Sequence, residues 1–458
     1  MRKTVLVFLS ILLVVSLSIF QKTAASDDYA DNEPVDLMLP IPLTPEMSED
    51  GKALYNAVPL IAVVDDLNPS VLRKIPAPAR FLDQPEAATS SFSITYIANG
   101  GADAWGERCY TFPEDARTAF DYAASIWVNT LNSDVPITIN ACWAELASAS
   151  TLGYSGGQPL RRDFSGATRS NTWYQGSVAN ALNGSDLDPS DFDMHITYNS
   201  LFDWYYGTDG NTPSTQHDLV TVVLHEMCHG LNFSGSMSYS GGSASWGYST
   251  GYPNIYDVFM KDGSGTQLID TSSYTNGSTA LGSAVTSNDI WFHGTKAMAA
   301  NGVQRVKMYA PSTWRSGSSY SHLDYDTFNN TSNQLMVYAI SAGESVHDPG
   351  AVNEGLLQDL GWTVDSTSNS YVDPAGSCGG NTPCYTTIQT AVNAASTGTT
   401  IKIVQGDYNE NVLLSTSKQV TLSGGWNTSY TTQSSNSSAN SIGVSAGTLI
   451  ADKVGAQG

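Results

Sequence analysis

The chain has 458 residues, with 20 Lys and Arg against 43 Asp and Glu and a formal charge of −23. A hydrophobic share of 41% excludes a disordered chain, and the length is enough for two or three domains with a large core. Only 14% of the residues are charged, and the acidic balance excludes nucleic acid and anionic membranes as partners, because phosphate binding needs clustered Lys and Arg.

Residues 1–25 have the pattern of a secretory signal peptide. A basic start precedes an apolar run from Val5 to Phe20, and small residues around Ala25 mark a cleavage point. The apolar run is short for a bilayer span of about 20 residues. We therefore expect a secreted, extracytoplasmic protein whose mature chain has no membrane span.

Five cysteines occur, and an oxidising compartment favours disulfides between cysteines that are close in sequence. We predict one disulfide between Cys109 and Cys142 and another between Cys378 and Cys384. Cys228 is left over, and its position inside the helical motif described below predicts a buried thiol.

Residues 26–90 are rich in Pro and acidic groups and lack strong periodicity. They are predicted to be either a propeptide or an extended N-terminal arm. The segment contains no Cys, so no thiolate of this segment can block a metal. If it inhibits an active site, it must act through a carboxylate, a backbone contact or simple occlusion.

A domain of the α+β class is predicted over residues 91–365. Alternating residues 92–97 indicate a half-buried strand, and apolar residues at helical spacing predict a helix over 113–129. Two further strands are expected at 135–142 and 194–198. Strands and long helices in this order favour a mixed fold rather than a sandwich.

The chemistry lies in an apolar helix that begins near Asp218 and contains the pattern HExxH. His225 and His229 are four residues apart, which places their imidazoles about 40° apart on one helical face, where they can share one metal ion. Glu226 lies beside them, where its carboxylate can reach a metal-bound water. The pattern predicts one catalytic zinc. The alternative is a buried helix in which the two histidines are only hydrogen-bonded and the HExxH spacing arises by chance.

Catalytic zinc takes three protein ligands. The compact pattern HExxHxxGxxH would place the third at position 235, which is Gly235. The chain instead resembles leishmanolysin-type metzincins, in which an insertion separates the helix from the third His. The resemblance covers about residues 91–362 and rests on four separated motifs, listed here with their positions: His225-Glu226-x-x-His229, Ser321-His322-Leu323-Asp324, Gln334-Leu335-Met336 and the tail Leu356–Trp362.

This resemblance implies that His322 is the third zinc ligand, with 92 residues between it and His229. It also implies that Met336 is the methionine of a turn beneath the metal. The family's turn glycine falls at Asn232, where Asn is the best non-Gly residue for a left-handed backbone.

Three other residues compete with His322 for the third position. His293 lies closer in sequence to the helix but lacks a downstream methionine turn, and Glu354 would give a site of the two-His-one-Glu type. Asp257 is the third competitor. Calcium has no support, because the loop from Asp203 to Asp218 has no EF-hand spacing.

The predicted function is a zinc metalloendopeptidase that hydrolyses peptide bonds of proteins or peptides. Zinc lowers the pKa of its bound water to about 7, and Glu226 then takes the proton as general base. A serine mechanism is disfavoured, because none of the Gly-x-Ser-x-Gly matches follows an apolar strand and opens a helix. Cys228 has no free His to activate it.

A polar linker is predicted over residues 366–377, and the pattern changes after it. Over 378–458 a helical patch precedes short apolar runs separated by Gly-, Ser- and Asn-rich turns. This resembles the opening of a parallel β-helix of the pectin-lyase-like superfamily, with about three coils of roughly 20–30 residues each. A β-sandwich module is the competing interpretation. No closing cap is visible, so an incomplete gene product is one expectation.

The β-helix-like segment supports an alternative function. The protein would then be a catalytically inactive surface or carbohydrate-binding protein, with cell-surface polysaccharide as its partner. A polysaccharide lyase is a weaker candidate, because so few coils provide little groove. The chelator dependence of proteolysis discriminates between the peptidase and the binding protein.

Overall fold

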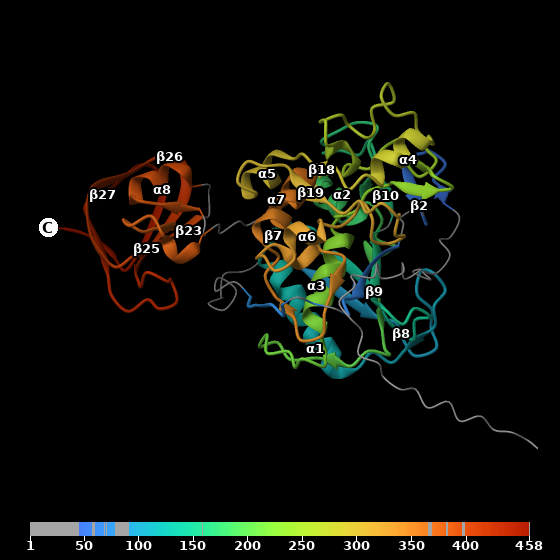
Figure 1. The fold of residues 1–458 in the computed structure, drawn as a ribbon, viewed down its shortest axis with the longest axis horizontal. Coiled ribbons are helices and arrows are strands. Elements are labelled where there is room, and N and C mark those ends of the chain that lie inside the picture. The colour runs from blue at the N-terminus through green and yellow to red at the C-terminus, as the bar shows by residue number, and fades with distance from the viewer. Residues whose placement is uncertain are drawn as a thin grey trace, which may run out of the picture. The chain divides into compact units, whose positions relative to one another are not determined.

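The computed structural model describes residues 45–56, 60–67, 69, 71–77, 91–157, 159–364, 369–381, 383–395 and 399–457. The predicted signal peptide lies outside the described residues. The described chain has a mixed α/β fold (Figure 1). Its helices are α1 Glu114–Val128, α2 Gly176–Asn183, α3 Leu219–Gly230, α4 Thr279–Val285, α5 Thr295–Ala300, α6 Tyr325–Phe328, α7 Ala351–Leu360 and α8 Ile388–Ala394, with 3-10 turns η2 Asp257–Phe259, η3 Gln334–Met336 and η4 Cys378–Gly380.

The main sheet has the strand order β20-β3-β9-β12-β8-β5, and β6 pairs with β8. Strand β12 is parallel to β8 and antiparallel to β9, and β8 is parallel to β5. Strand β3 is antiparallel to β9 and parallel to β20. The strands are β3 Ile61–Asp65, β5 Phe92–Tyr96, β6 Cys109–Tyr110, β8 Ile137–Ala144, β9 Thr151–Gly157, β12 Met194–Asn199 and β20 Ala339–Ile340.

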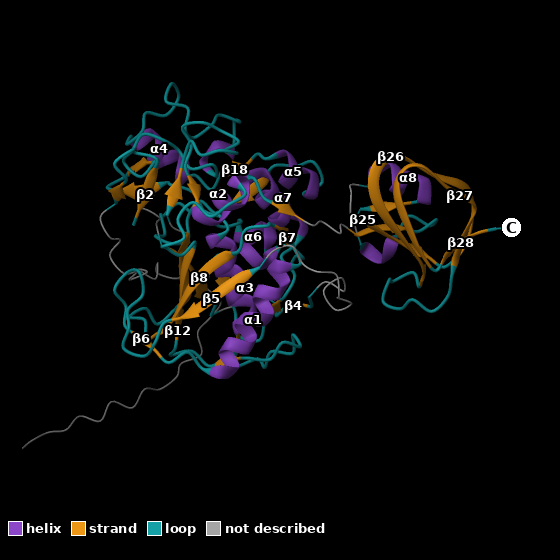
Figure 2. Cartoon of the chain, turned by 180° about the vertical axis from the view of Figure 1, so that it is seen from behind, coloured by secondary structure: helices purple, strands orange, loops and turns teal. Residues whose placement is uncertain are grey.

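Helices α1 and α3 lie side by side along this sheet (Figure 2). Alternate residues of β8 point to opposite faces, so Ile139 and Ala141 join the large core with these helices, whereas Cys142 joins a smaller core on the other face. The indole N–H of Trp127 on α1 donates to the carbonyl of Leu224 on α3 at 3.2 Å. The sheet and α1 thus hold α3 in a fixed position.

The regular elements agree with the sequence pattern to within a few residues. The predicted helix over 113–129 is α1, and its apolar stripe is buried at Phe120, Ala123 and Trp127. The predicted strands correspond to β5, β8 and β12. Pro113 takes the N-cap position, one residue before the first turn in which we placed it.

The N-terminal segment that we predicted as a propeptide or arm contributes strands to the folded body. Strand β3 lies inside the main sheet, and β2 pairs with β10 in a smaller sheet of order β1-β2-β10-β11. Another small sheet has the order β17-β18-β19, and the other pairs are β13-β14, β15-β16, β21-β4 and β22-β7. These strands are β1 Glu46–Met47, β2 Ala53–Tyr55, β4 Lys74–Ile75, β7 Leu131–Asn132, β10 Leu160–Arg161, β11 Tyr174–Gln175, β13 Trp204–Tyr205, β14 His217–Asp218, β15 Ser238–Ser240, β16 Ser243–Ser245, β17 Met260–Asp262, β18 Ile290–Phe292, β19 Val306–Met308, β21 Ser345–Val346 and β22 Thr363–Val364.

The C-terminal part is a curled parallel sheet of order β24-β23-β25-β26-β27-β28, with α8 packed against it. Its strands are β23 Asn369–Val372, β24 Cys384–Tyr385, β25 Thr399–Val404, β26 Gly406–Trp426, β27 Ser437–Asp452 and β28 Val454–Ala456. All of its strand pairs are parallel, unlike those of a sandwich of antiparallel sheets. Strand β23 lies in the stretch predicted as a linker, because pairing with β25 buries Val372 completely, so the ordered sheet begins before Cys378.

Both predicted disulfides are confirmed, between Cys109 and Cys142 and between Cys378 and Cys384. Cys228 is a buried free thiol, as predicted. Within the described ranges, no helix has the length and apolar character needed to cross a bilayer.

Candidate metal centre

Helix α3 is enclosed along its whole length, since each of its residues from Leu219 to Gly230 is buried. The Asp218 side chain caps its N-terminus by accepting the backbone N–H of Thr221 at 2.9 Å. Asn232 follows the helix with φ of 78°, the left-handed conformation predicted for this residue. A helix rich in Val and closed on every side is stabilised by tertiary packing more than by its intrinsic propensity.

Three imidazoles converge at the C-terminal half of α3. The Nε2 atoms of His225 and His229 are 3.0 Å apart, and that of His322 lies 3.1 Å from the first and 3.2 Å from the second. Tetrahedral zinc with Zn–N distances of about 2.0–2.1 Å requires nitrogen atoms about 3.3–3.4 Å apart. The observed separations are close to that requirement.

The outer nitrogen of each imidazole is fixed by a backbone carbonyl. Nδ1 of His225 donates to Leu335 at 2.6 Å, and Nδ1 of His322 donates to Ser318 at 2.8 Å. Nδ1 of His229 donates to the carbonyl of Phe233 at 2.8 Å. A carbonyl oxygen only accepts, so each neutral ring carries its proton on Nδ1 and directs the lone pair of Nε2 inward. Three converging lone pairs repel one another unless a cation lies between them.

Burial keeps these imidazoles neutral. It lowers the pKa of His225 to about 4, and it lowers the pKa values of His229 and His322 well below the usual range, with a further contribution from neighbouring imidazoles. The neutral ring is the form that binds a metal. The donor set therefore fits a divalent transition metal with nitrogen preference.

Glu226 is fully buried beside this cluster. Its Oε1 accepts the backbone N–H of Val63 at 3.2 Å, whereas its Oε2 has no hydrogen-bond partner within the described part of the chain. Burial raises the pKa of Glu226 to about 8, although the Val63 N–H favours the charged form. A cation at the imidazoles would lower this pKa again.

The competing third ligands do not join the cluster. Among the described residues, the only group of three or more His, Cys, Asp or Glu side chains with converging ligand atoms is His225, His229 and His322. Asp257 instead accepts the backbone N–H of Ser236 at 3.0 Å. His293 and Glu354 lie outside the group, and the metal role of the three histidines stays a prediction.

Gly235 and Met336 were singled out by the motifs, and both lie in close contact with the surroundings of the site. A Cβ on Gly235, where the compact pattern needs a His, would lie 2.3 Å from a ring carbon of Tyr320 and 2.5 Å from Oδ1 of Asp257, so no side chain fits there. Met336 is fully buried in η3, and its carbonyl accepts the N–H of Leu323 at 2.8 Å. This bond ties the residue after His322 to the turn beneath α3.

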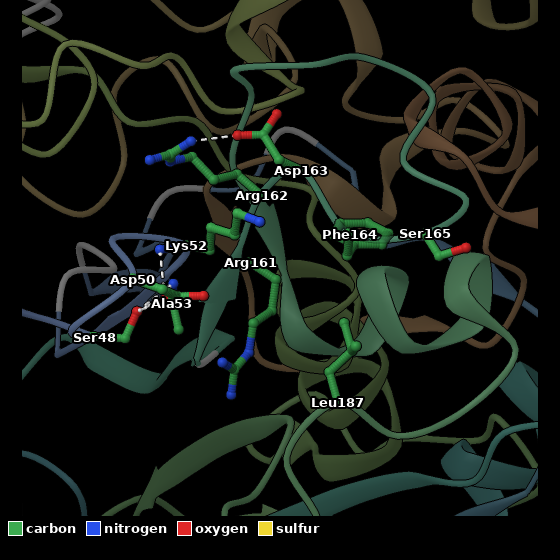
Figure 3. A pocket seen from close by; sticks show the side chains of 10 residues that line it. All are labelled: Ser48, Asp50, Lys52, Ala53, Arg161, Arg162, Asp163, Phe164, Ser165 and Leu187. Atoms are coloured by element: carbon green, nitrogen blue, oxygen red, sulfur yellow. Dashed lines mark hydrogen bonds and ion pairs between the residues drawn. The ribbon is translucent and has the colours of Figure 1, made fainter.

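A separate pocket of about 290 Å³ is lined by residues of the turn between β1 and β2, of β10 and of the loop that follows β10 (Figure 3). Lys52, Arg161 and Arg162 line it together with acidic side chains. Arg161 is already paired with Asp188 at 2.6 Å. The pocket contains none of the site histidines and marks where the N-terminal segment is anchored.

Sequence reasoning missed Val63, which comes from 163 positions before Glu226 and contacts it through a backbone N–H. A backbone donor leaves no residue-type signal. The carbonyls of Phe233, Ser318 and Leu335 were missed for the same reason. The only signal in the sequence was the absence of Cys from residues 26–90. It left a backbone contact as one of three ways in which this segment could inhibit an active site.

A family model described as SPBPB7E8-like matches residues 185–244, a stretch that contains α3 and both of its site histidines. The match covers much less than half of the chain. No curated protein and no solved structure matches the chain.

Proposed function

We propose that the protein is a secreted zinc endopeptidase in which His225, His229 and His322 hold one zinc ion and Glu226 is the general base. One observation carries the proposal. Three buried imidazoles each carry their proton on Nδ1, so their Nε2 atoms are unprotonated, and these atoms converge beside Glu226, whose Oε2 has no partner among the described residues. Three imidazoles with a neighbouring acid are the donor set of a hydrolytic zinc site.

Bound zinc supplies Lewis-acid chemistry that lowers the pKa of water and polarises a carbonyl group. Glu226 as a carboxylate removes a proton from water while the water oxygen bonds to the peptide carbonyl carbon. The same carboxyl group returns the proton to the amide nitrogen as the C–N bond breaks, which leaves a carboxylic acid and an amine. In the described form the Val63 N–H holds Oε1, and Oε2, which has no partner among the described residues, is the oxygen that we assign to the proton transfer.

The finer class that we propose is a metzincin of leishmanolysin type. Its support is the chain order of α3, His322 and the buried turn at Met336, together with the bond from Leu323 N–H to the Met336 carbonyl. For the C-terminal sheet we propose a short parallel β-helix, which its uniformly parallel pairing supports.

The test is hydrolysis of casein by purified protein, before and after limited proteolysis, with and without a chelator and then with zinc restored. We expect chelation to abolish hydrolysis and zinc to restore it, with one zinc per chain in the untreated protein. Hydrolysis that a chelator leaves unchanged overturns the metal-dependent mechanism.

A binding protein for cell-surface polysaccharide is the second candidate, and the outer polar side chains of the C-terminal sheet favour it. The Ser441 hydroxyl donates to Asn411 Oδ1 of the adjacent strand at 2.7 Å, and Ser438 donates to Asp407 in the same way. Polysaccharide binding by a chain that never hydrolyses casein would support this candidate over the peptidase.

A further inference from the structure

The metal centre is closed to solvent. His225, Glu226 and His322 are 0% exposed and His229 is 1% exposed. A peptidase must admit an extended chain and a water molecule to these side chains. Some element of the described form must therefore cover the centre.

Strand β3 lies against the centre at Glu226. Its Val63 is 0% exposed, donates its N–H to Glu226 at 3.2 Å and belongs to the same core as α3. Ala62 belongs to the smaller core on the other face of the sheet, as strand alternation requires. The strand thus lays the Val63 position directly against the proposed general base.

The strand is held by backbone bonds along both of its edges. On one edge it pairs antiparallel with β9, with Val63 opposite Gly153. On the other edge Ala62 N–H donates to Gly317 at 3.0 Å and Val64 N–H donates to Tyr338 at 3.0 Å. Gly317 shortly precedes His322, and Tyr338 shortly follows Met336. Without β3, strand β9 on one side and these two segments on the other would be the walls of a groove beside the metal centre.

A groove of this kind holds a peptide in the extended form, because the bonds are made to backbone groups, and the side chains beside it decide which residues fit. Gly153 is needed there, since a Cβ at this position would lie 3.0 Å from the carbonyl of Thr197 and 3.6 Å from Cγ of Glu226. The wall of β9 therefore comes close to the general base without a side chain of its own.

The carboxylates that follow Val64 do not reach the metal centre. Asp65 accepts from Nε2 of His217 at 2.8 Å, and Asp66 accepts the hydroxyl of Tyr325. Neither acid belongs to the metal-ligating group within the described residues. If the segment blocks the centre, it does so through its backbone contact with Glu226 and by occlusion, and without a carboxylate on the metal.

We propose that residues 60–66 occupy the peptide-binding groove of the enzyme, so that the described form is latent and the freed groove takes an extended, aliphatic peptide. The proposal rests on the proposed peptidase function. Leu67 and Val71, which follow the strand in the chain, are 75% and 54% exposed, so a second protease can reach the chain at these residues. Cleavage there would let the segment before it leave β9.

The first test uses the full chain loaded with zinc and carrying the recognition sequence of a site-specific protease in place of residues 67–71. The matched control carries the same sequence beside Val303, which is 77% exposed in another loop. We measure casein hydrolysis and binding of a fluorescent peptide with the sequence of residues 60–66, before and after cutting.

We expect cutting after β3 to raise casein hydrolysis at least tenfold and to permit peptide binding, whereas the control cut does neither. Equal hydrolysis before and after cutting overturns latency and leaves the peptidase standing. If no form hydrolyses casein but only the protein cut after β3 binds the peptide, the groove stands and the peptidase fails. If cutting produces neither hydrolysis nor peptide binding, the groove proposal is overturned.

The second test isolates the contact with Glu226. Val63→Pro removes the N–H donor in the intact chain, and Val71→Pro is the control outside the strand. We expect Val63→Pro to show casein hydrolysis without cutting, at least tenfold above the control, with circular dichroism verifying that both variants are folded. In the peptide, N-methylation at the Val63 position should weaken binding about tenfold or more, because it removes a hydrogen bond to a charged group. Unchanged binding contradicts the assigned contact.

Discussion

At the first turn of α3, Nε2 of His347 lies 2.8 Å from Oδ2 of Asp218, whereas at the last turns three imidazole Nε2 atoms lie only 3.0–3.2 Å from one another. Both ends of the helix are buried and polar. At the first end the carboxylate also accepts the hydroxyl of Thr212 at 3.0 Å and the N–H of Thr221 at 2.9 Å. That network is satisfied by the protein alone.

At the second end the Nδ1 atom of each imidazole donates to a backbone carbonyl, whereas each Nε2 atom faces only other Nε2 atoms. His225 and His322 each donate outward to a carbonyl, and both direct a lone pair inward. A buried polar group without a partner costs about 1–3 kcal/mol, so a set that stays unpartnered indicates a ligand that is not part of the chain. Nε2 of the structural residue His347 faces a carboxylate, whereas Nε2 of each candidate metal ligand faces only other imidazoles.

The largest expected effect is at the second end. Glu226→Gln should lower casein hydrolysis by about 10²–10⁴-fold or more, because the amide cannot accept the proton, while zinc content stays at one per chain. Steady-state rates and metal analysis of the same preparation check this. Loss of zinc in the variant would show that Glu226 is a ligand instead.

His322→Ala should lose its zinc on dialysis at fixed pH, because one of the three protein ligands is removed. We expect its zinc affinity to fall by more than the roughly 10–100-fold that is typical when a residue supporting a ligand is changed. His293→Ala is the matched control and should keep its zinc. The reverse result would assign the third ligand position to His293.

At the first end, Asp218→Ala should lower the free energy of unfolding by about 2–3 kcal/mol, because it removes the helix cap and leaves buried His347 without its acceptor. Zinc per folded chain should be unchanged. Urea unfolding gives the stability, and metal analysis gives the second quantity. A variant that keeps its stability but loses zinc would show that the two ends are coupled.

The smallest expected effect is at Cys228, which precedes His229 in the last turn of α3. Burial raises the pKa of its thiol, so it stays protonated and unreactive. Cys228→Ala should cost about 1 kcal/mol of stability through a small cavity and leave hydrolysis unchanged. A large loss of activity at constant zinc content would point to a cysteine mechanism.

Local patterns predicted much of the fold. The apolar stripe of α1, the alternation of β5 and the start of α3 at Asp218 all depend on neighbours within one or two turns, and each occurs where it was expected. The disulfides followed from short separations, 33 residues for Cys109–Cys142 and 6 for Cys378–Cys384. The start of the C-terminal sheet was placed too late, because β23 is short and polar and is defined by its pairing with β25.

The sequence by itself determined the helix with HExxH and therefore the placement of two histidines and one acid on adjoining positions, because a helix repeats every 3.6 residues. Only the tertiary structure brought His322 to that helix from across 92 residues and removed His293 and Glu354 from consideration. It alone placed Val63 on Glu226. Backbone carbonyls and N–H groups are the same at every residue, so contacts made through them appear only once the chain has folded.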